Sequence, residues 1–156
     1  VLTQSLAICE YLEECFPEPP LLPAGPGERA AVRAMELAVA CDIHPLNNLR
    51  VQQYLRDGLG QDDAAVARWM RHWIAEGFGA LETLIERNSR DGRHCFGGSV
   101  TLADACLVPQ VYNARRAGLD LVPWPRLAAV ASHLESLPEF AAARPEAQPD
   151  APPGAG

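Results

Sequence analysis

Residues 101–104 read Thr-Leu-Ala-Asp, and this stretch decides the fold because it marks the start of a helix. In a capping box the Thr hydroxyl accepts from the N–H three residues later, and the acidic side chain there accepts from the Thr N–H. An apolar run follows, and Gly118 is placed to end the helix. We therefore expect a central helix over 102–117, with Thr101 and Asp104 as structural capping residues.

Helical spacing of apolar residues extends from this helix in both directions, with no convincing two-residue alternation. We expect further helices over residues 5–15, 28–56, 63–87 and 126–137, and a short turn around Phe140. The stretch 17–28 contains five prolines and two glycines, which is typical of a linker. The pattern predicts an all-α chain divided at residues 1–16, 17–28, 29–143 and 144–156, the last being a flexible tail.

The expected helix over 28–56 has two apolar faces. At 100° per residue, a sector of roughly 80° contains Leu37, Cys41, His44, Asn48, Val51 and Leu55. His44 and Asn48 are then neighbours one turn apart, and Pro45 between them should kink the helix. In the next helix, Gly77 and Gly79 suggest close helix packing, because each costs roughly 1 kcal/mol relative to Ala.

Composition and charge exclude several classes of protein. The net charge is −7, and all 13 basic residues are Arg, spread along the chain, so nucleic acid is not expected as a partner. No apolar run approaches the roughly 20 residues of a bilayer helix, so we expect a soluble protein without a membrane partner. Five cysteines without a C-x-x-C pair suggest reduced core thiols in a cytoplasm. Cys41 and His44 alone do not make a metal site.

Two polar groups allow both a structural and a functional interpretation. Gln4 and Ser5 stand at a helix start, where unpaired N–H groups and the helix dipole favour a ligand carboxylate, although Ser5 or Thr3 could simply cap the helix. Arg115 and Arg116 end the helix over 102–117, where positive charge complements the dipole. The alternative for this pair is an anion clamp.

Several stretches together resemble the zeta class of soluble glutathione transferases, which includes maleylacetoacetate isomerases and bacterial maleylpyruvate isomerases. They are TQSLAI at 3–8, CDIHPLNNLR at 41–50, Trp73-Ile74 with Gly77-Phe78, LVPQV at 107–111, and NARR at 113–116, and the match extends to residue 150. The resemblance implies the C-terminal helical bundle of a glutathione transferase. Residues 1–16 would hold the last helix of a thioredoxin-like domain that is otherwise missing from this sequence.

The resemblance also implies a ligand for each candidate residue. Gln4 and Ser5 would bind the γ-glutamyl end of glutathione, and His44 and Asn48 would line the cleft beside glutathione or substrate. Arg116, with Arg115 as the less favoured neighbour, would bind a carboxylate of a dianionic substrate. The family's Ser-rich motif, which holds the glutathione sulfur as thiolate, has no counterpart here, so no catalytic residue is assigned.

The implied activity is glutathione-dependent cis–trans isomerisation of maleylacetoacetate to fumarylacetoacetate, in tyrosine and phenylalanine catabolism, by a cytoplasmic homodimer. In this reaction glutathione thiolate adds to the alkene, a bond rotates and the thiol leaves. We expect the chain as given to be inactive without the thiolate-activating motif. Leu49, where some maleylpyruvate isomerases carry Arg, favours maleylacetoacetate over maleylpyruvate. A conjugating transferase and a non-catalytic interaction module remain as alternatives.

Overall fold

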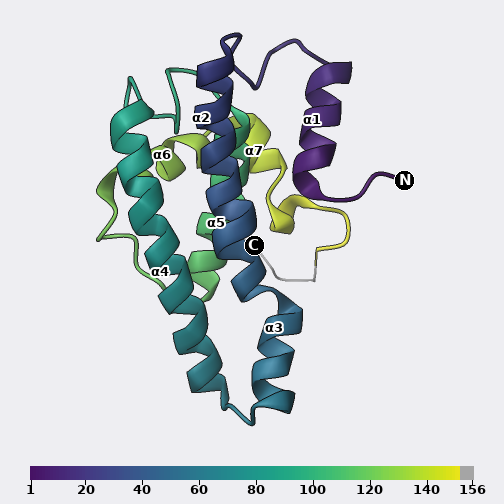
Figure 1. Cartoon of the computed structure of the whole chain (residues 1–156), viewed down its shortest axis with the longest axis vertical. Helices are drawn as coiled ribbons and strands as arrows, with labels where there is room; N and C mark the ends of the chain where they lie inside the picture. The colour runs from purple at the N-terminus through teal and green to yellow at the C-terminus, as the bar shows by residue number, and fades with distance from the viewer. Residues whose placement is uncertain (152–156) are drawn as a thin grey trace.

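The computed structural model describes residues 1–151, which form helices joined by turns (Figure 1). The α-helices are α1 (Ser5–Cys15), α2 (Pro26–Leu37), α3 (Leu49–Gln53), α4 (Asp63–Asn88), α5 (Leu102–Arg116), α6 (Pro125–Glu135) and α7 (Pro138–Ala142). In residues 1–151, extended backbone pairing is confined to an isolated bridge between Ser89 and Gly97. The all-α prediction is confirmed.

The core lies around α5, which packs against α2 on one side and α6 on the other, while α4 packs against α6. Met35 of α2, Phe78 of α4, Leu107 of α5 and Leu127 of α6 have almost no exposed surface. None of the described helices is long and apolar enough to span a bilayer. The lower end of α4 extends beyond this core together with α3, as Figure 1 shows.

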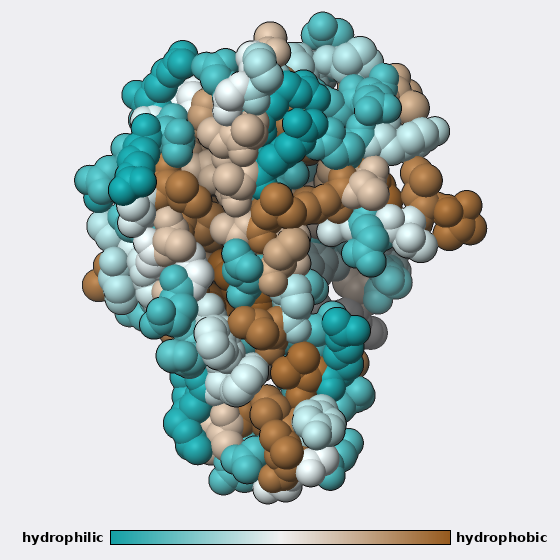
Figure 2. Space-filling model, in the orientation of Figure 1, coloured by the Kyte–Doolittle hydropathy of each residue, from teal (hydrophilic) through white to brown (hydrophobic). Residues whose placement is uncertain are grey.

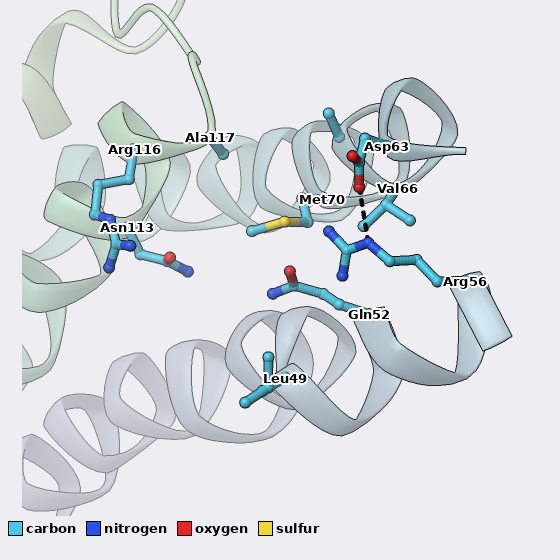
Figure 3. A pocket seen from close by; sticks show the side chains of 10 residues that line it. Leu49, Gln52, Arg56, Asp63, Val66, Met70, Asn113, Arg116 and Ala117 are labelled. Atoms are coloured by element: carbon cyan, nitrogen blue, oxygen red, sulfur yellow. Dashed lines mark hydrogen bonds and ion pairs between the residues drawn. The ribbon is translucent and has the colours of Figure 1, made fainter. Parts of the chain in front are cut away.

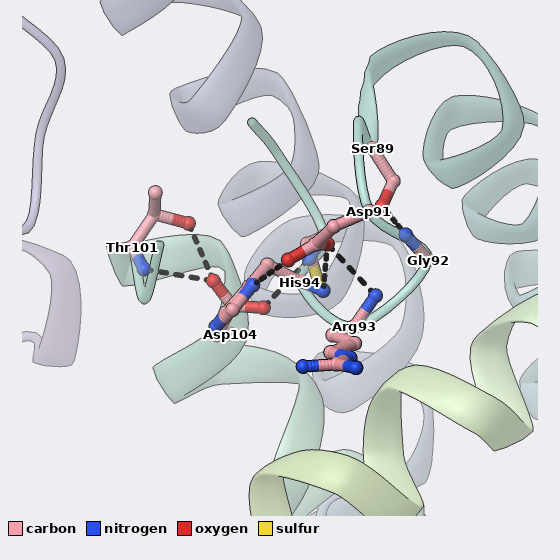
Figure 4. Close-up of polar contacts among 8 residues, drawn as sticks. Ser89, Asp91, Gly92, Arg93, His94, Thr101 and Asp104 are labelled. Carbon is pink, nitrogen blue, oxygen red and sulfur yellow. Dashed lines mark hydrogen bonds and ion pairs between the residues drawn. The ribbon is translucent and has the colours of Figure 1, made fainter. Parts of the chain in front are cut away.

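The capping box at the start of α5 is confirmed. Asp104 is fully buried, and its carboxylate accepts from the N–H of Thr101 at 2.7 Å, from the Thr101 hydroxyl at 2.8 Å and from the N–H of Cys95 at 2.7 Å (Figure 4). The bond to Cys95 ties the preceding loop to the helix. Gly118, with a φ of 73°, ends the helix in the left-handed region that glycine favours.

The single helix expected over 28–56 is wrong. The chain begins α2 at Pro26 and then passes through a π-helix η1 (Ala38–Ile43), a 3-10 helix η2 (His44–Asn47), α3 and a second π-helix η3 (Tyr54–Gly58). Pro45 lacks an N–H donor, and both helix types depart from 3.6 residues per turn. The expected apolar face is therefore not continuous: Leu37 is 45% exposed whereas Leu55 is 8% exposed.

The segment η1–η2 is held against α4. A Cβ built on Gly77 would lie 2.2 Å from Cγ1 of Ile43, which confirms the close packing expected there. Gly79 has no such neighbour, so the same expectation for Gly79 is wrong. The Trp69 indole N–H donates to the Leu46 carbonyl at 2.7 Å and fastens η2 to the same helix.

Helix α1 is attached to the bundle by two carboxylates. Glu10 accepts from Arg33 of α2 in a two-bond pair of 2.6 and 2.9 Å. Glu13 accepts from the backbone N–H groups of Leu21 and Leu22 in the linker, at 2.9 and 3.0 Å. These bonds attach the second half of α1 to the helical domain.

The C-terminal segment from Arg144 contains a 3-10 helix, η4 (Pro145–Ala147), within residues 144–151. The Tyr112 hydroxyl of α5 donates to Glu146 at 2.5 Å and connects this segment to the bundle. The flexible tail expected over 144–156 falls partly on residues 152–156, which lie outside the described residues.

Of the five cysteines predicted to be core thiols, only Cys95 is fully buried. Cys95 is buried, Cys9 and Cys106 are half-buried, and Cys15 and Cys41 are exposed. The two exposed thiols lie at the end of α1 and in η1, where the helix turns its other face inward.

Candidate functional site

A cleft of about 440 Å³ lies where α3 and η3 face the start of α4 and the end of α5 (Figure 3). Its volume falls within the roughly 300–1,000 Å³ of small-molecule sites. The lining residues are Leu49, Gln52, Arg56, Asp63, Val66, Ala67, Met70, Asn113, Arg116 and Ala117. Apolar, polar and charged side chains thus share the lining of this cleft.

The structure separates the two arginines at the end of α5. Arg115 forms an ion pair with Glu135 of α6. Arg116 lines the cleft and has no ion-pair partner within residues 1–151. Asn113, three residues earlier on the same helix, stands beside it in Figure 3. Arg116 is therefore the one of the pair that is available to a ligand anion in the cleft.

His44 and Asn48 lie on the segment that leads into the cleft but are not among the residues that line it. His44 is exposed at the start of η2, and Asn48 is half-buried. The Asn48 side chain accepts from the N–H of Arg50 at 3.2 Å and so caps α3. Its neighbour Asn47 is buried and donates to the Ile43 carbonyl at 3.0 Å, a structural role that sequence reasoning missed.

Gln4 and Ser5 occupy the start of α1, where neither Thr3 nor Ser5 caps the helix. Gln4 is the N-cap residue, and no side chain bonds to the first turn. Its φ of 70° lies in the region that L-residues rarely adopt. Such backbone strain costs about 1–3 kcal/mol and is concentrated at functional sites. The first-turn N–H groups of α1 are consequently open to an external acceptor.

Four polar lining residues are not among the site residues expected from the sequence, namely Gln52, Arg56, Asp63 and Asn113. Asn113 could have been found from its i,i+3 spacing to Arg116 on one helix face. Arg56 and Asp63 belong to different helices, and their 2.8 Å ion pair depends on the turn between them. No local pattern signals that pair.

Buried titratable groups lie away from this cleft, between α1, α2 and α5. Glu36 is 1% exposed, and burial, followed by the charge of Glu10, raises its pKa to about 7. Burial also raises the pKa of the Cys106 thiol to about 12 and that of Cys9 above its usual value. These thiols stay protonated at neutral pH and are poor nucleophiles.

Comparisons with known proteins agree with the fold. Residues 63–136 match the family described as glutathione S-transferase, C-terminal domain. A probable maleylacetoacetate isomerase of Vibrio cholerae is 51% identical over 96% of this chain and 69% of the relative. The holo structure of a bacterial zeta-class maleyl pyruvate isomerase has a TM-score of 0.94 and 48% identity, over 97% of this chain and 71% of that one.

A third similar protein is the maleylacetoacetate isomerase of Anaeromyxobacter dehalogenans, crystallised with dicarboxyethyl glutathione and citrate in its active site. Its TM-score is 0.91, and it is 46% identical over 98% of this chain and 67% of that one. The helical architecture is thus that of a glutathione transferase C-terminal domain. More narrowly, the chain belongs to the zeta-class glutathione transferase family of the maleylacetoacetate isomerases.

Proposed function

We propose that this chain forms the larger part of a glutathione-dependent cis–trans isomerase that converts maleylacetoacetate to its fumaryl isomer. The observation that carries the proposal is the unpaired guanidinium of Arg116 in a cleft lined by both polar and apolar side chains, in a chain 51% identical to a probable maleylacetoacetate isomerase. An Arg fork binds a carboxylate through two parallel hydrogen bonds. The substrate carries two carboxylates, so one end of it matches Arg116.

Glutathione fits the start of α1 in this proposal. Gln4 and Ser5 hold an open helix N-terminus, where N–H groups and the dipole favour the γ-glutamyl carboxylate. The strained backbone of Gln4 supports a binding role for this position. When bound, glutathione supplies a thiolate that adds reversibly to the maleyl double bond and so permits rotation. His44 and Asn48, on the segment that leads into the cleft, are proposed to face glutathione.

The contribution of this chain is binding, orientation and charge. Arg116 would hold one carboxylate while the apolar wall formed by Val66, Met70 and Ala117 excludes water from the hydrocarbon part of the substrate. Fixing one end of the substrate lowers the entropic cost of bringing the alkene to the sulfur. Arg115, already paired with Glu135, is the weaker candidate for this role.

The cellular setting is part of the proposal. We place the protein in the cytoplasm because all five cysteines are free thiols. Its role in the catabolism of aromatic amino acids is proposed from its similarity to maleylacetoacetate isomerases. A homodimer is supported by apolar side chains exposed on α1 and directly after it: Tyr11 of α1 is 49% exposed, and Phe16, which follows the helix, is 69% exposed. Figure 2 shows further hydrophobic surface at the N-terminal end. Light scattering on the purified chain measures the oligomeric state directly.

Activity is tested in two forms of the protein. One is the 156-residue chain, which contains no counterpart of the family's Ser-rich motif and which we expect not to isomerise maleylacetoacetate. The other joins this chain to the remaining amino-terminal part of the Vibrio cholerae relative, and it should show glutathione-dependent turnover. A maleylpyruvate preference in the joined protein would favour the alternative substrate. Turnover by neither form would contradict the proposal and favour a non-catalytic interaction module.

In the joined protein, Arg116→Ala should lower kcat/KM. The loss of transition-state stabilisation calculated from this decrease should be about 2 kcal/mol, the value of a charged hydrogen-bond partner. Arg115→Ala is the matched control, because it removes an adjacent arginine that is paired with Glu135. We expect the control to change kcat/KM by less than about threefold, as for an exposed ion pair. Equal losses for both variants would remove Arg116 from its proposed role.

A further inference from the structure

A second arginine faces the same cleft from the wall opposite Arg116. Arg56 of η3 donates from Nε to Oδ1 of Asp63 at 2.8 Å. Its two terminal nitrogens point into the cleft, toward the end occupied by Arg116 and Asn113, as Figure 3 shows. Within residues 1–151 these terminal nitrogens have no hydrogen-bond acceptor. The cleft therefore has, at each end, a guanidinium with N–H donors that are free to bind an anion.

The geometry of the Arg56–Asp63 pair decides which part of the guanidinium a ligand can use. Arg presents five N–H donors in a rigid plane. Asp63 engages the Nε side, which leaves the end-on pair of terminal N–H groups for a second carboxylate. Asp63 is the first residue of α4, and that helix is capped by Asp62, which accepts from the N–H of Ala65 at 2.7 Å. Asp63, whose side chain is 88% exposed, thus pairs with Arg56 from the first turn of a capped helix.

The other side chains that line the cleft are of kinds that suit the middle of a dicarboxylate. Val66, Met70 and Ala117 are apolar, while Gln52 adds a neutral amide that also donates to the Asn47 carbonyl at 2.9 Å. The ligand that fits has a carboxylate at each end and a carbon chain with carbonyls between them. Its carboxylates would meet the two guanidinium groups, and its carbon chain would contact the apolar side chains. A monocarboxylate would satisfy only one end.

We propose that Arg56 binds the second carboxylate of the dicarboxylate substrate and that its separation from Arg116 selects the length of that substrate. This inference rests on the proposed function, because it concerns the same cleft. Other arginines fit the role less well: Arg115 is paired with Glu135, and Arg50 is not among the lining residues. Arg56 is a binding residue, and Asp63 is a positioning residue that acts through it.

The first test measures binding to the 156-residue chain without any turnover. Saturated dicarboxylates from succinate to suberate are titrated, with acetate as the single-carboxylate probe, and the Arg side-chain Nε–H signals are followed by NMR. Affinity should pass through a maximum as the carbon chain lengthens. Arg56→Gln should weaken binding at that maximum by about tenfold, the lower end for a charged hydrogen bond at a partly exposed group, and abolish the length dependence.

Matched variants separate the role of Arg56 from general effects of charge. Arg68→Gln removes an exposed arginine of α4 that does not line the cleft, and it should leave the length dependence unchanged. Arg56→Lys retains the charge but loses the planar fork, so it should recover only part of the affinity. Asp63→Asn retains an acceptor for Nε but removes a negative charge, so binding should tighten a few-fold. Thermal unfolding of each variant checks that η3 is retained.

The second test uses turnover by the joined protein, with maleylacetoacetate and the shorter maleylpyruvate as substrates. Arg56→Gln should lower kcat/KM for the preferred substrate by about tenfold and bring the two substrates closer together. If Arg56→Gln binds dicarboxylates and turns over both substrates like the parent, the inference is overturned and the proposed function stands. If no form isomerises but Arg56→Gln loses length-dependent binding, the proposed function fails and the dicarboxylate site remains.

Discussion

Replacement of Gly77 by Ala is the perturbation whose effect can be worked out most directly from the structure. The added Cβ would lie 2.2 Å from Cγ1 and 2.4 Å from Cδ1 of Ile43. Ile43 is fully buried at the end of η1, directly before His44, so its side chain has little room to move. Overpacking of this kind costs about 1–3 kcal/mol.

Helix propensity opposes this cost, because Ala is about 1 kcal/mol better than Gly in a helix interior. The expected net effect of Gly77→Ala is therefore a loss of about 0–2 kcal/mol. Gly79→Ala is the matched control, since a Cβ there meets nothing within 4 Å and the residue is exposed. That variant should be stabilised by up to about 1 kcal/mol. The difference between the two variants isolates the steric clash.

Urea unfolding of the 156-residue chain, followed by circular dichroism and by tryptophan fluorescence, measures both free energies. Ile43→Ala provides the internal check, because it removes both clashing atoms. This substitution should cost about 2–5 kcal/mol in the parent chain but distinctly less in the Gly77→Ala background. The reasoning is refuted if Gly77→Ala is as stable as Gly79→Ala, or if the two substitutions at Ile43 and Gly77 are additive.

Two further predictions concern buried carboxylates. Asp104→Ala leaves the donors of Thr101 and Cys95 without an acceptor, so urea unfolding should show a loss of about 3 kcal/mol, and a loss below about 1 kcal/mol would contradict the capping role. Glu36 has a folded-state pKa of about 7, above that of an exposed carboxyl, so its neutral form supports stability at low pH and this contribution is lost as pH rises from about 4.5 to 7. Glu36→Gln should flatten the pH dependence of the unfolding free energy in that interval, and an unchanged slope would show that Glu36 is not its source.

The start of α5 could be predicted from sequence because its signal is local. Thr101 and Asp104 are three residues apart, and the bonds between them depend only on the first turn of the helix. The bond from Cys95 to Asp104 could not be predicted in the same way, because it requires the preceding loop to fold back. Local chemistry therefore fixed the helix start but not the burial of the carboxylate.

The prediction of one long helix over residues 28–56 is wrong for a related reason. A prediction from periodicity assumes 100° per residue, and one π-helical turn is enough to shift every later side chain to another face. Pro45 signals an interruption of the helix, but the π-helices at Ala38–Ile43 and Tyr54–Gly58 have no comparable residue signal. Arg56 belongs to the second of these π-helices, so the direction of its side chain could not be derived from the helical spacing of the apolar residues.

The two arginines at the end of α5 show what only tertiary structure can decide. Adjacent residues on a helix point about 100° apart, so one of Arg115 and Arg116 must face a different neighbour from the other. Which one faces the cleft depends on Glu135 of α6, a residue 20 positions away that pairs with Arg115. The same argument applies to Arg56, whose direction depends on Asp63 across a turn. A cationic site of this kind is therefore defined as much by the carboxylates that occupy neighbouring arginines as by the arginines left open to the ligand.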